Sequence, residues 1–154
     1  MSRLNAGDPA PSFEMTADDG SIVSSASLAG SRYVLYFYPK DDTPGCTAQA
    51  CGLRDSWSRV AETGVQIFGV SPDGTKSHVK FREKHGLPYR LLSDTGHAVA
   101  EAFGVWIEKH FAGRTYFGNE RTTFIVGPDG RIEHVLPQVK PAAHVDQLLE
   151  ALAA

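Results

Sequence analysis

The sequence predicts an α/β protein with a mixed central sheet, helices on both faces of that sheet and an N-terminal hairpin. Residues 33–38 and 65–70 are short apolar runs rich in β-branched and aromatic side chains, which is typical of buried strands. The segment between them reads as a helix that begins at Thr43-Pro44 and ends near Gly64. Strand, helix and strand in this order indicate a parallel pair of strands joined by a crossover helix.

The remaining segments add strands toward both ends of the chain and helices between them. Residues 13–16 and 21–24 flank the turn sequence Asp-Asp-Gly and form the predicted N-terminal hairpin. The sequence Gly-Pro-Asp-Gly at 127–130 likewise predicts a hairpin between strands 121–126 and 131–136. The other expected elements are a helix between residues 75 and 86, a strand at 89–92, a helix at 97–103, a strand or extended loop at 113–118 and a final amphipathic helix from Pro141.

The composition is typical of an ordinary soluble globular protein, with 42% hydrophobic and 21% charged residues in a chain of 154. This length suits one domain over residues 1–154. The net charge of −3 predicts no basic face for nucleic acid or for an acidic membrane surface. No apolar run approaches the ~20 residues of a membrane span and no signal-peptide core is visible, so we expect a cytoplasmic protein.

Both cysteines of the chain lie just inside the helix predicted after strand 33–38. Cys46 falls in its first turn, where backbone N–H groups have no acceptor within the helix and favour an anionic thiolate. The hydroxyl of Thr43 could cap the helix, or donate to the sulfur or to a substrate oxygen beside it. Because the thiolate is the nucleophilic form of cysteine, these features indicate a reactive thiol.

The spacing of Cys46 and Cys51 limits how the two thiols can bond. Five residues along a regular helix separate their Cα atoms by roughly 8–9 Å and by about 140° round the axis. A disulfide needs Cα atoms within about 7 Å of each other. The thiols therefore cannot join while the helix is intact, and a disulfide requires the first turn or two to unwind.

Three other interpretations of the cysteines stay open on the residues alone. Free cysteines are often small core residues, and a non-catalytic binding module would hold inert thiols; Cys51 suits this role best. A metal site is the second alternative, but the C-x4-C spacing is unusual for zinc, and His78 and His85 are expected on a solvated helix face. A thiol–disulfide oxidoreductase is the third, although its usual C-x-x-C is absent.

The sequence YFYPKDDTPGCT at 36–47, followed by ACGLRD at 50–55, resembles the peroxiredoxins. More narrowly, it is similar to their bacterioferritin comigratory protein (peroxiredoxin Q) subfamily, and the resemblance runs from residue 7 to the closing helix. It implies a thioredoxin-like fold with an N-terminal extension. It also implies a thiol-dependent peroxidase for hydrogen peroxide and organic hydroperoxides that uses no metal or organic cofactor.

The resemblance assigns roles to individual residues. Cys46 matches the peroxidatic cysteine, Cys51 matches the subfamily's resolving cysteine, and Pro39, Thr43 and Gly45 match positions that bind the peroxide. The implied cycle is attack by Cys46, a sulfenic acid, unwinding of the helix start, a Cys46–Cys51 disulfide and reduction by thioredoxin or a similar dithiol. We expect a monomer, with a weak dimer as the alternative.

A thiolate that attacks a peroxide also needs a fixed cation, and arginine suits better than lysine because its planar fork can reach sulfur and oxygen together. Arg121 opens a strand beside apolar residues, where a charge needs a partner. Four other arginines remain candidates on the residues alone: Arg32, Arg54, Arg90 and Arg114. The resemblance selects Arg121, because Glu-Arg-Thr-Thr-Phe at 120–124 matches the family segment that supplies the active-site arginine.

One position departs from the subfamily's pattern. The subfamily commonly has Glu two residues before its second cysteine, and this chain has Gln49. A carboxylate there could pair with an arginine near the site, whereas an amide hydrogen-bonds without carrying charge. We therefore expect the fine tuning of the site to differ, and its identity to hold.

Overall fold

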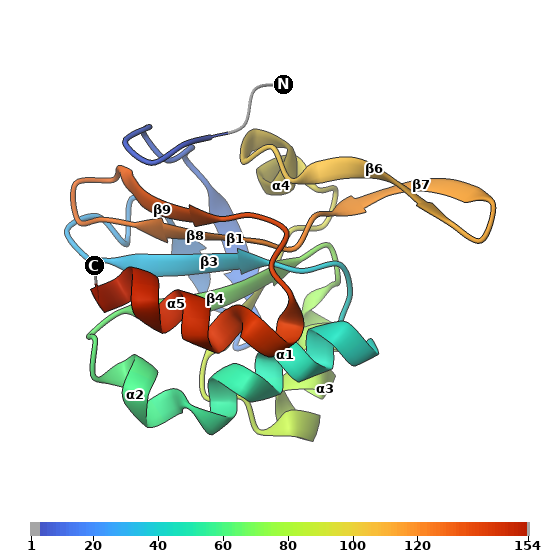
Figure 1. Cartoon of the computed structure of the whole chain (residues 1–154), viewed down its shortest axis with the longest axis horizontal. Helices are drawn as coiled ribbons and strands as arrows, with labels where there is room; N and C mark the ends of the chain where they lie inside the picture. Colours follow the sequence, from blue (N-terminus) through green and yellow to red (C-terminus); the bar gives the residue numbers. More distant parts are fainter. Residues whose placement is uncertain (1–3, 154) are drawn as a thin grey trace.

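A seven-stranded sheet forms the centre of the molecule (Figure 1). The computed structural model describes residues 4–153. The strands follow the order β2-β1-β5-β4-β3-β8-β9 across the sheet. Their bounds are β1 (Glu14–Ala17), β2 (Ile22–Ser24), β3 (Tyr33–Phe37), β4 (Gln66–Ser71), β5 (Arg90–Ser93), β8 (Thr122–Val126) and β9 (Ile132–Leu136).

The pairing of these strands is mixed, as the sequence predicts. Strands β3, β4 and β5 run parallel to one another, and β3 also pairs in antiparallel fashion with β8. The pairing of β3 with β4 confirms the predicted parallel pair. The N-terminal hairpin β1–β2 is a continuous part of the sheet, because β1 pairs with the outer side of β5. The predicted extension therefore widens the sheet at one edge.

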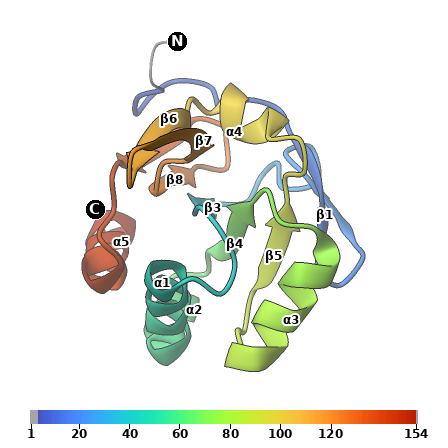
Figure 2. The ribbon, with the colours of Figure 1, turned by 90° about the vertical axis from the view of Figure 1, so that its right-hand side faces the viewer.

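Helices cover both faces of the sheet, but unevenly (Figure 2). One face carries α1 (Pro44–Asp55), α2 (Trp57–Ala61), α3 (Thr75–His85) and α5 (His144–Ala153), with the short 3₁₀ turn η1 (Pro141–Ala143) leading into α5. The short helix α4 (Ala98–Ala102) lies over the other face. Within residues 4–153, none of these helices combines the length and the apolar character that crossing a membrane requires.

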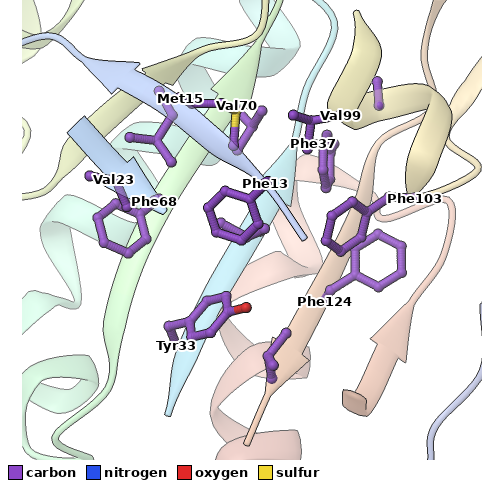
Figure 3. Close-up of a cluster of buried hydrophobic side chains, with 14 of the residues drawn as sticks. Phe13, Met15, Val23, Tyr33, Phe37, Phe68, Val70, Val99, Phe103 and Phe124 are labelled. Atoms are coloured by element: carbon purple, nitrogen blue, oxygen red, sulfur yellow. The ribbon is translucent and has the colours of Figure 1, made fainter. Parts of the chain in front are cut away.

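Strand β3 separates two hydrophobic cores, because successive side chains of a strand point to opposite faces. All five of its residues are buried. Tyr33, Leu35 and Phe37 join the core beneath α4, where aromatic rings gather (Figure 3). Val34 and Tyr36 join the core beneath the four helices of the other face. The strand that precedes Cys46 is thus fixed from both sides.

The predicted continuous helix from residue 44 to Gly64 is wrong at one point. Helix α1 ends at Asp55 and α2 begins at Trp57, because Ser56 leaves helical geometry with φ −106° and ψ 18°. Ser and Asp side chains compete for backbone hydrogen bonds, which favours helix ends over helix interiors. Leu53 and Val60 nevertheless bury completely in the same core.

No strand is predicted from the sequence at residues 106–111, and the structure has one there. Strand β6 (Trp106–Phe111) pairs with β7 (Arg114–Asn119), which covers the segment predicted as a strand or extended loop. This hairpin projects from the body of the molecule (Figure 1). Phe111 is 74% exposed and Phe117 is 57% exposed. Only the base of the hairpin, at Trp106, packs against the core beneath α4, and the projecting part lacks the alternating burial by which strands are recognised in a sequence.

Candidate active site

Cys46 lies in the first turn of α1, immediately after the central strand β3. Thr43 occupies the N-cap position with extended backbone angles, Pro44 opens the helix, and the Thr47 N–H donates to the Thr43 carbonyl at 2.8 Å. The N–H groups of Gly45 and Cys46 therefore precede the first helical hydrogen bond and belong to its positive end. The thiol is 1% exposed. The predicted position of Cys46 is confirmed.

The Thr43 side chain does not cap the helix as expected. Its hydroxyl donates to the Lys40 carbonyl at 2.9 Å, and α1 has no side-chain hydrogen bond at its N-cap. Pro39 is half-buried between β3 and this turn, and Thr43 is half-buried too. Both residues thus border the start of α1, but the Thr43 hydroxyl is engaged by the turn and not by the sulfur.

Arg121 is the arginine that reaches Cys46. Its Nη1 donates to the Cys46 sulfur at 3.4 Å and to Gln49 Oε1 at 2.7 Å. A Cβ added to Gly45 would lie 3.0 Å from Arg121 Nη2, so the guanidinium occupies the space beside this glycine. The Val139 N–H donates to the Arg121 carbonyl at 2.7 Å and fixes the backbone from which the side chain extends.

The other four candidate arginines make contacts away from Cys46 or lie on the exposed hairpin. Arg32 pairs with Glu133 at 2.8 Å. Arg54 pairs with Asp55 at 3.0 Å. Arg90 lies over the Phe68 ring at 5.3 Å from its centroid. Arg114 begins the exposed strand β7.

Gln49 connects the site to two buried side chains, His144 and Thr123, that sequence reasoning does not predict to be functional. Its amide nitrogen lies 3.1 Å from His144 Nδ1, and His144 Nε2 lies 2.9 Å from Thr123 Oγ1. Gln49, His144 and Thr123 are each 0% exposed. Burial, with a smaller contribution from the Arg121 charge, lowers the pKa of His144 to about 4. One signal was available in the sequence: His144 falls four residues before Leu148, on the apolar stripe of the last helix.

Cys46 and Cys51 are both free thiols in one unbroken helix. Cys51 is half-buried, whereas its neighbours Ala50 and Leu53 are completely buried. The Tyr89 hydroxyl donates to the Ala50 carbonyl at 3.3 Å and contributes to holding this turn. This geometry is that of a dithiol state with the start of the helix fully wound.

A buried cluster holds the turn that precedes α1. The Tyr38 hydroxyl donates to one Asp41 carboxylate oxygen at 2.5 Å, and the Ser77 hydroxyl donates to the other at 2.8 Å. His78 Nδ1 lies 2.7 Å from that second oxygen, and its Nε2 lies 3.0 Å from the Leu92 carbonyl. His78 is 0% exposed, so the solvated helix face expected for it is wrong. Helix α3 turns this face toward β5 and the active-site turn.

The same cluster brings one ligand atom each from Asp41, Asp73 and His78 within 4.8 Å of one another. Hydrogen bonds already engage these atoms, since Asp73 Oδ2 accepts from the Asp41 N–H at 2.8 Å and from Ser71 Oγ at 2.6 Å. These hydrogen bonds hold the turn that precedes α1 against the start of α3.

Lys109 on β6 is a second cation whose charge interacts with that of Cys46. Burial of Lys109 on β6, followed by the charge of Arg121, lowers the pKa of its ammonium group, while the Cys46 charge acts in the opposite direction. A buried sulfur at the positive end of a helix, with a guanidinium against it, can carry negative charge and can stabilise charge moving onto an oxygen beside it.

Comparison with known proteins gives the same family from three directions. The model of the AhpC/TSA family matches residues 6–135. Peroxiredoxin Bcp of Escherichia coli K12 is 46% identical over 152 residues, covering 99% of this chain and 97% of that protein. Peroxiredoxin Bcp of Bacillus subtilis 168 is 46% identical over 149 residues, covering 97% of this chain and 95% of that protein.

Solved structures agree with these relatives. The bacterioferritin comigratory protein of Xanthomonas campestris, studied for its alkyl peroxide reduction activity, matches with a TM-score of 0.85 at 36% identity over 92% of this chain and 90% of that one. A mutant of PrxQ from Xylella fastidiosa matches with a TM-score of 0.91 at 30% identity over 99% and 98% of the two chains. These matches confirm the thioredoxin-like fold. This chain belongs to the AhpC/TSA family and, within it, to the Bcp/PrxQ peroxiredoxins, which are peroxidases.

Proposed function

We propose that Cys46 is the peroxidatic thiol of a cycle that reduces hydrogen peroxide and organic hydroperoxides. The Cys46 thiolate attacks one peroxide oxygen, so that an S–O bond forms and the O–O bond breaks. The departing oxygen takes a proton and leaves as water or an alcohol, and Cys46 becomes a sulfenic acid. The sulfur is oxidised and the peroxide is reduced by two electrons.

One observation carries this assignment. Arg121 Nη1 lies 3.4 Å from the sulfur of a buried cysteine in the first turn of a helix. The guanidinium and the first-turn N–H groups set positive charge against the sulfur that would act as the nucleophile. The same donors would stabilise the charge that develops on the departing oxygen, which is where electrostatic stabilisation lowers a barrier most.

Three neighbouring residues are proposed to shape the peroxide site. Thr43 would exchange its bond with the Lys40 carbonyl, now 2.9 Å long, for a bond to a peroxide oxygen. Gly45 leaves the space that the Arg121 guanidinium fills, because a Cβ there would come within 3.0 Å of Nη2. Pro39, half-buried before the turn, would limit the access of water to the thiol.

Cys51 is the proposed resolving cysteine. Its sulfur would attack the Cys46 sulfenic acid and release water as the disulfide forms. Both residues lie within α1, so this step requires the helix to unwind between them, which breaks the bonds of Gln49 to Arg121 and to His144. A dithiol reductant of the thioredoxin kind would then reduce the disulfide by exchange and become oxidised itself.

We further propose that the chain acts as a single domain and as a monomer, with a weak dimer as the alternative. The cycle consumes one dithiol for each peroxide and therefore needs a steady supply of reductant. This requirement favours a reducing compartment such as the cytoplasm.

Mass spectrometry of the reduced protein after one equivalent of hydrogen peroxide tests the two cysteine roles directly. The expected product has lost two hydrogens, with a tryptic link between Cys46 and Cys51. A stable one-oxygen adduct on Cys46 would keep the peroxidase and reject Cys51 as the resolving residue. Thiols that stay reduced for many minutes would overturn the proposal.

Two serine variants separate the steps. Cys46→Ser should abolish peroxide consumption, and activity in this variant would show that the nucleophile is misassigned. Cys51→Ser should retain the first oxidation, slow recycling by the dithiol and increase overoxidation of Cys46. Normal turnover over many cycles in Cys51→Ser would show that this cysteine is only a packing residue.

A further inference from the structure

A chain of buried hydrogen bonds joins the last helix to the active-site arginine. Arg121 Nη1 bonds to Gln49 Oε1 at 2.7 Å, Gln49 Nε2 to His144 Nδ1 at 3.1 Å, and His144 Nε2 to Thr123 Oγ1 at 2.9 Å. The chain links α1, η1–α5 and β8 at the level of the Cys46 sulfur. Its three members besides Arg121 are fully buried, so a wrong donor or acceptor here cannot be corrected by water.

The direction of every bond in this chain follows from the arginine. A guanidinium only donates, so the Gln49 atom that faces it must be the carbonyl oxygen. The Gln49 amide N–H₂ then faces His144, and Nδ1 must accept with a free lone pair. The ring proton of a neutral His144 therefore resides on Nε2, from which it is donated to Thr123 Oγ1. Turning the Gln49 amide round would place N–H₂ against the guanidinium, which is a contact between two donors.

The surroundings of His144 keep its ring neutral. The ring packs against Tyr36 of β3 at 5.6 Å between ring centroids. Gln49 faces it from α1, and Thr123 and the Arg121 charge face it from the start of β8. Burial and this positive charge lower the pKa of His144 to about 4. At neutral pH the histidine is thus an acceptor at Nδ1 and a donor at Nε2.

We propose that His144 is a positioning residue for Arg121: by accepting the Gln49 amide N–H₂ at Nδ1, it holds the Gln49 carbonyl oxygen against the guanidinium. Arg121 Nη1 carries two hydrogens: one is held by Gln49 Oε1 at 2.7 Å, and the other is then directed to the Cys46 sulfur at 3.4 Å. The consequence for peroxide reduction rests on the role of Arg121 given in the proposed function. The tautomer of His144 follows from the hydrogen bonds alone.

The Gln49→Glu substitution should reverse the donor and acceptor roles in the two hydrogen bonds of His144. A carboxylate has no hydrogen to offer, so both of its oxygens accept, one from Arg121 and the other from His144. His144 must then carry a proton on Nδ1, while the Thr123 hydroxyl can rotate to donate to Nε2. One substitution at the residue bonded to the ring thus predicts a defined change in which ring nitrogen carries the proton.

Long-range ¹H–¹⁵N NMR of histidine-labelled, reduced protein at pH 7 tests this inference without measuring activity. His144 is assigned by the signal that is lost in His144→Asn. We expect a bare Nδ1 and a protonated Nε2 in the wild type, and a protonated Nδ1 in Gln49→Glu. His78 supplies an internal reference, since both of its nitrogens face acceptors in Asp41 and Leu92. A protonated Nδ1 in the wild type would overturn the proposal.

Stopped-flow oxidation by hydrogen peroxide in a single turnover tests the consequence for the site. His144→Asn can place its side-chain oxygen where Nδ1 accepts, so its rate should stay within about threefold of the wild type. His144→Leu removes the acceptor and should react about tenfold more slowly. The control is His110→Asn, which removes a histidine side chain that is 73% exposed on the projecting hairpin.

The rates of these variants decide between positioning and packing. Equal losses in His144→Asn and His144→Leu would mean that the ring acts only as packing, and a normal rate in His144→Leu would reject any role. A wild type that consumes no peroxide would instead reject the proposed function, while the NMR assignment of the tautomer would still stand or fall on its own.

Discussion

The buried, neutral His144 makes the stability of this protein depend on pH, and the size of the effect follows from its pKa. The ordinary histidine pKa is 6.5, and in the folded protein that of His144 is lowered to about 4. Between these values the unfolded chain binds a proton that the folded chain does not, so stability falls as the pH falls. The two pKa values differ by about 2.5, which corresponds to about 3.5 kcal/mol in the acid limit, at about 1.4 kcal/mol for each pH unit between them.

The His144→Asn variant isolates this contribution, because it removes the titrating ring and keeps a hydrogen-bonding side chain. Urea denaturation of both proteins, reduced, at pH 7.5 and pH 5.0 gives the change in the free energy of unfolding of each. On lowering the pH, the wild type should lose about 2 kcal/mol more than the variant. The other ionisable groups are the same in both proteins and cancel in this difference.

A parallel loss of stability in the two proteins would refute the assignment of His144 as a buried neutral group. If the two proteins lose stability in parallel, within about 0.5 kcal/mol, His144 does not titrate as a buried neutral group. The chain of hydrogen bonds through Gln49 would then need a different arrangement of protons. A larger loss of stability in the variant than in the wild type would mean that folding does not lower the pKa of His144.

Further measurements test the packing and the chemistry of the site. Arg121→Lys keeps the charge but loses the planar fork, so the single-turnover rate with peroxide should fall about 100-fold; a loss below threefold would show that charge alone suffices. Gly45→Ala should displace the guanidinium, whose Nη2 would lie 3.0 Å from the new Cβ, and slow the single-turnover reaction about tenfold in stopped-flow measurements. The temperature of thermal unfolding should change little, because the greater helix preference of Ala, about 1 kcal/mol, offsets the cost of this close contact. Leu53→Ala empties a completely buried position and should cost about 3 kcal/mol in urea denaturation, with an unchanged value pointing to a site that collapses without penalty. Hydrogen exchange should show that the amides of residues 47–51 lose protection on oxidation to the disulfide; equal protection in both states would contradict the unwinding of α1.

The elements nearest the thiol were predictable from the sequence because they depend on local patterns. An apolar run of β-branched and aromatic residues can be satisfied only by burial, and β3 is buried on both faces. Thr43-Pro44 marks a helix start through backbone geometry that proline imposes, and Cys46 consequently falls in the first turn. The spacing of Cys46 and Cys51 likewise follows from helix geometry alone.

Local patterns misjudged residues whose environment comes from distant parts of the chain. His78 has the spacing of a solvated helix face, yet Asp41 and the Leu92 carbonyl surround it. Strand β6 escaped prediction because most of its hairpin projects beyond the core. The break at Ser56 escaped because a single residue ends one helix and begins another.

The sequence by itself determined where the nucleophile lies, and the tertiary structure decided what surrounds it. Arg121 is separated from Cys46 by 75 residues along the chain, and only the pairing of β3 with β8 brings the two together. Residues alone left five arginines open, and the family resemblance was needed to choose among them. His144, 95 residues beyond Gln49, gave only a polar position on an apolar stripe. Helix and strand formation follow from neighbours in sequence, whereas the protonation and orientation of a buried side chain follow from whichever groups the fold places against it.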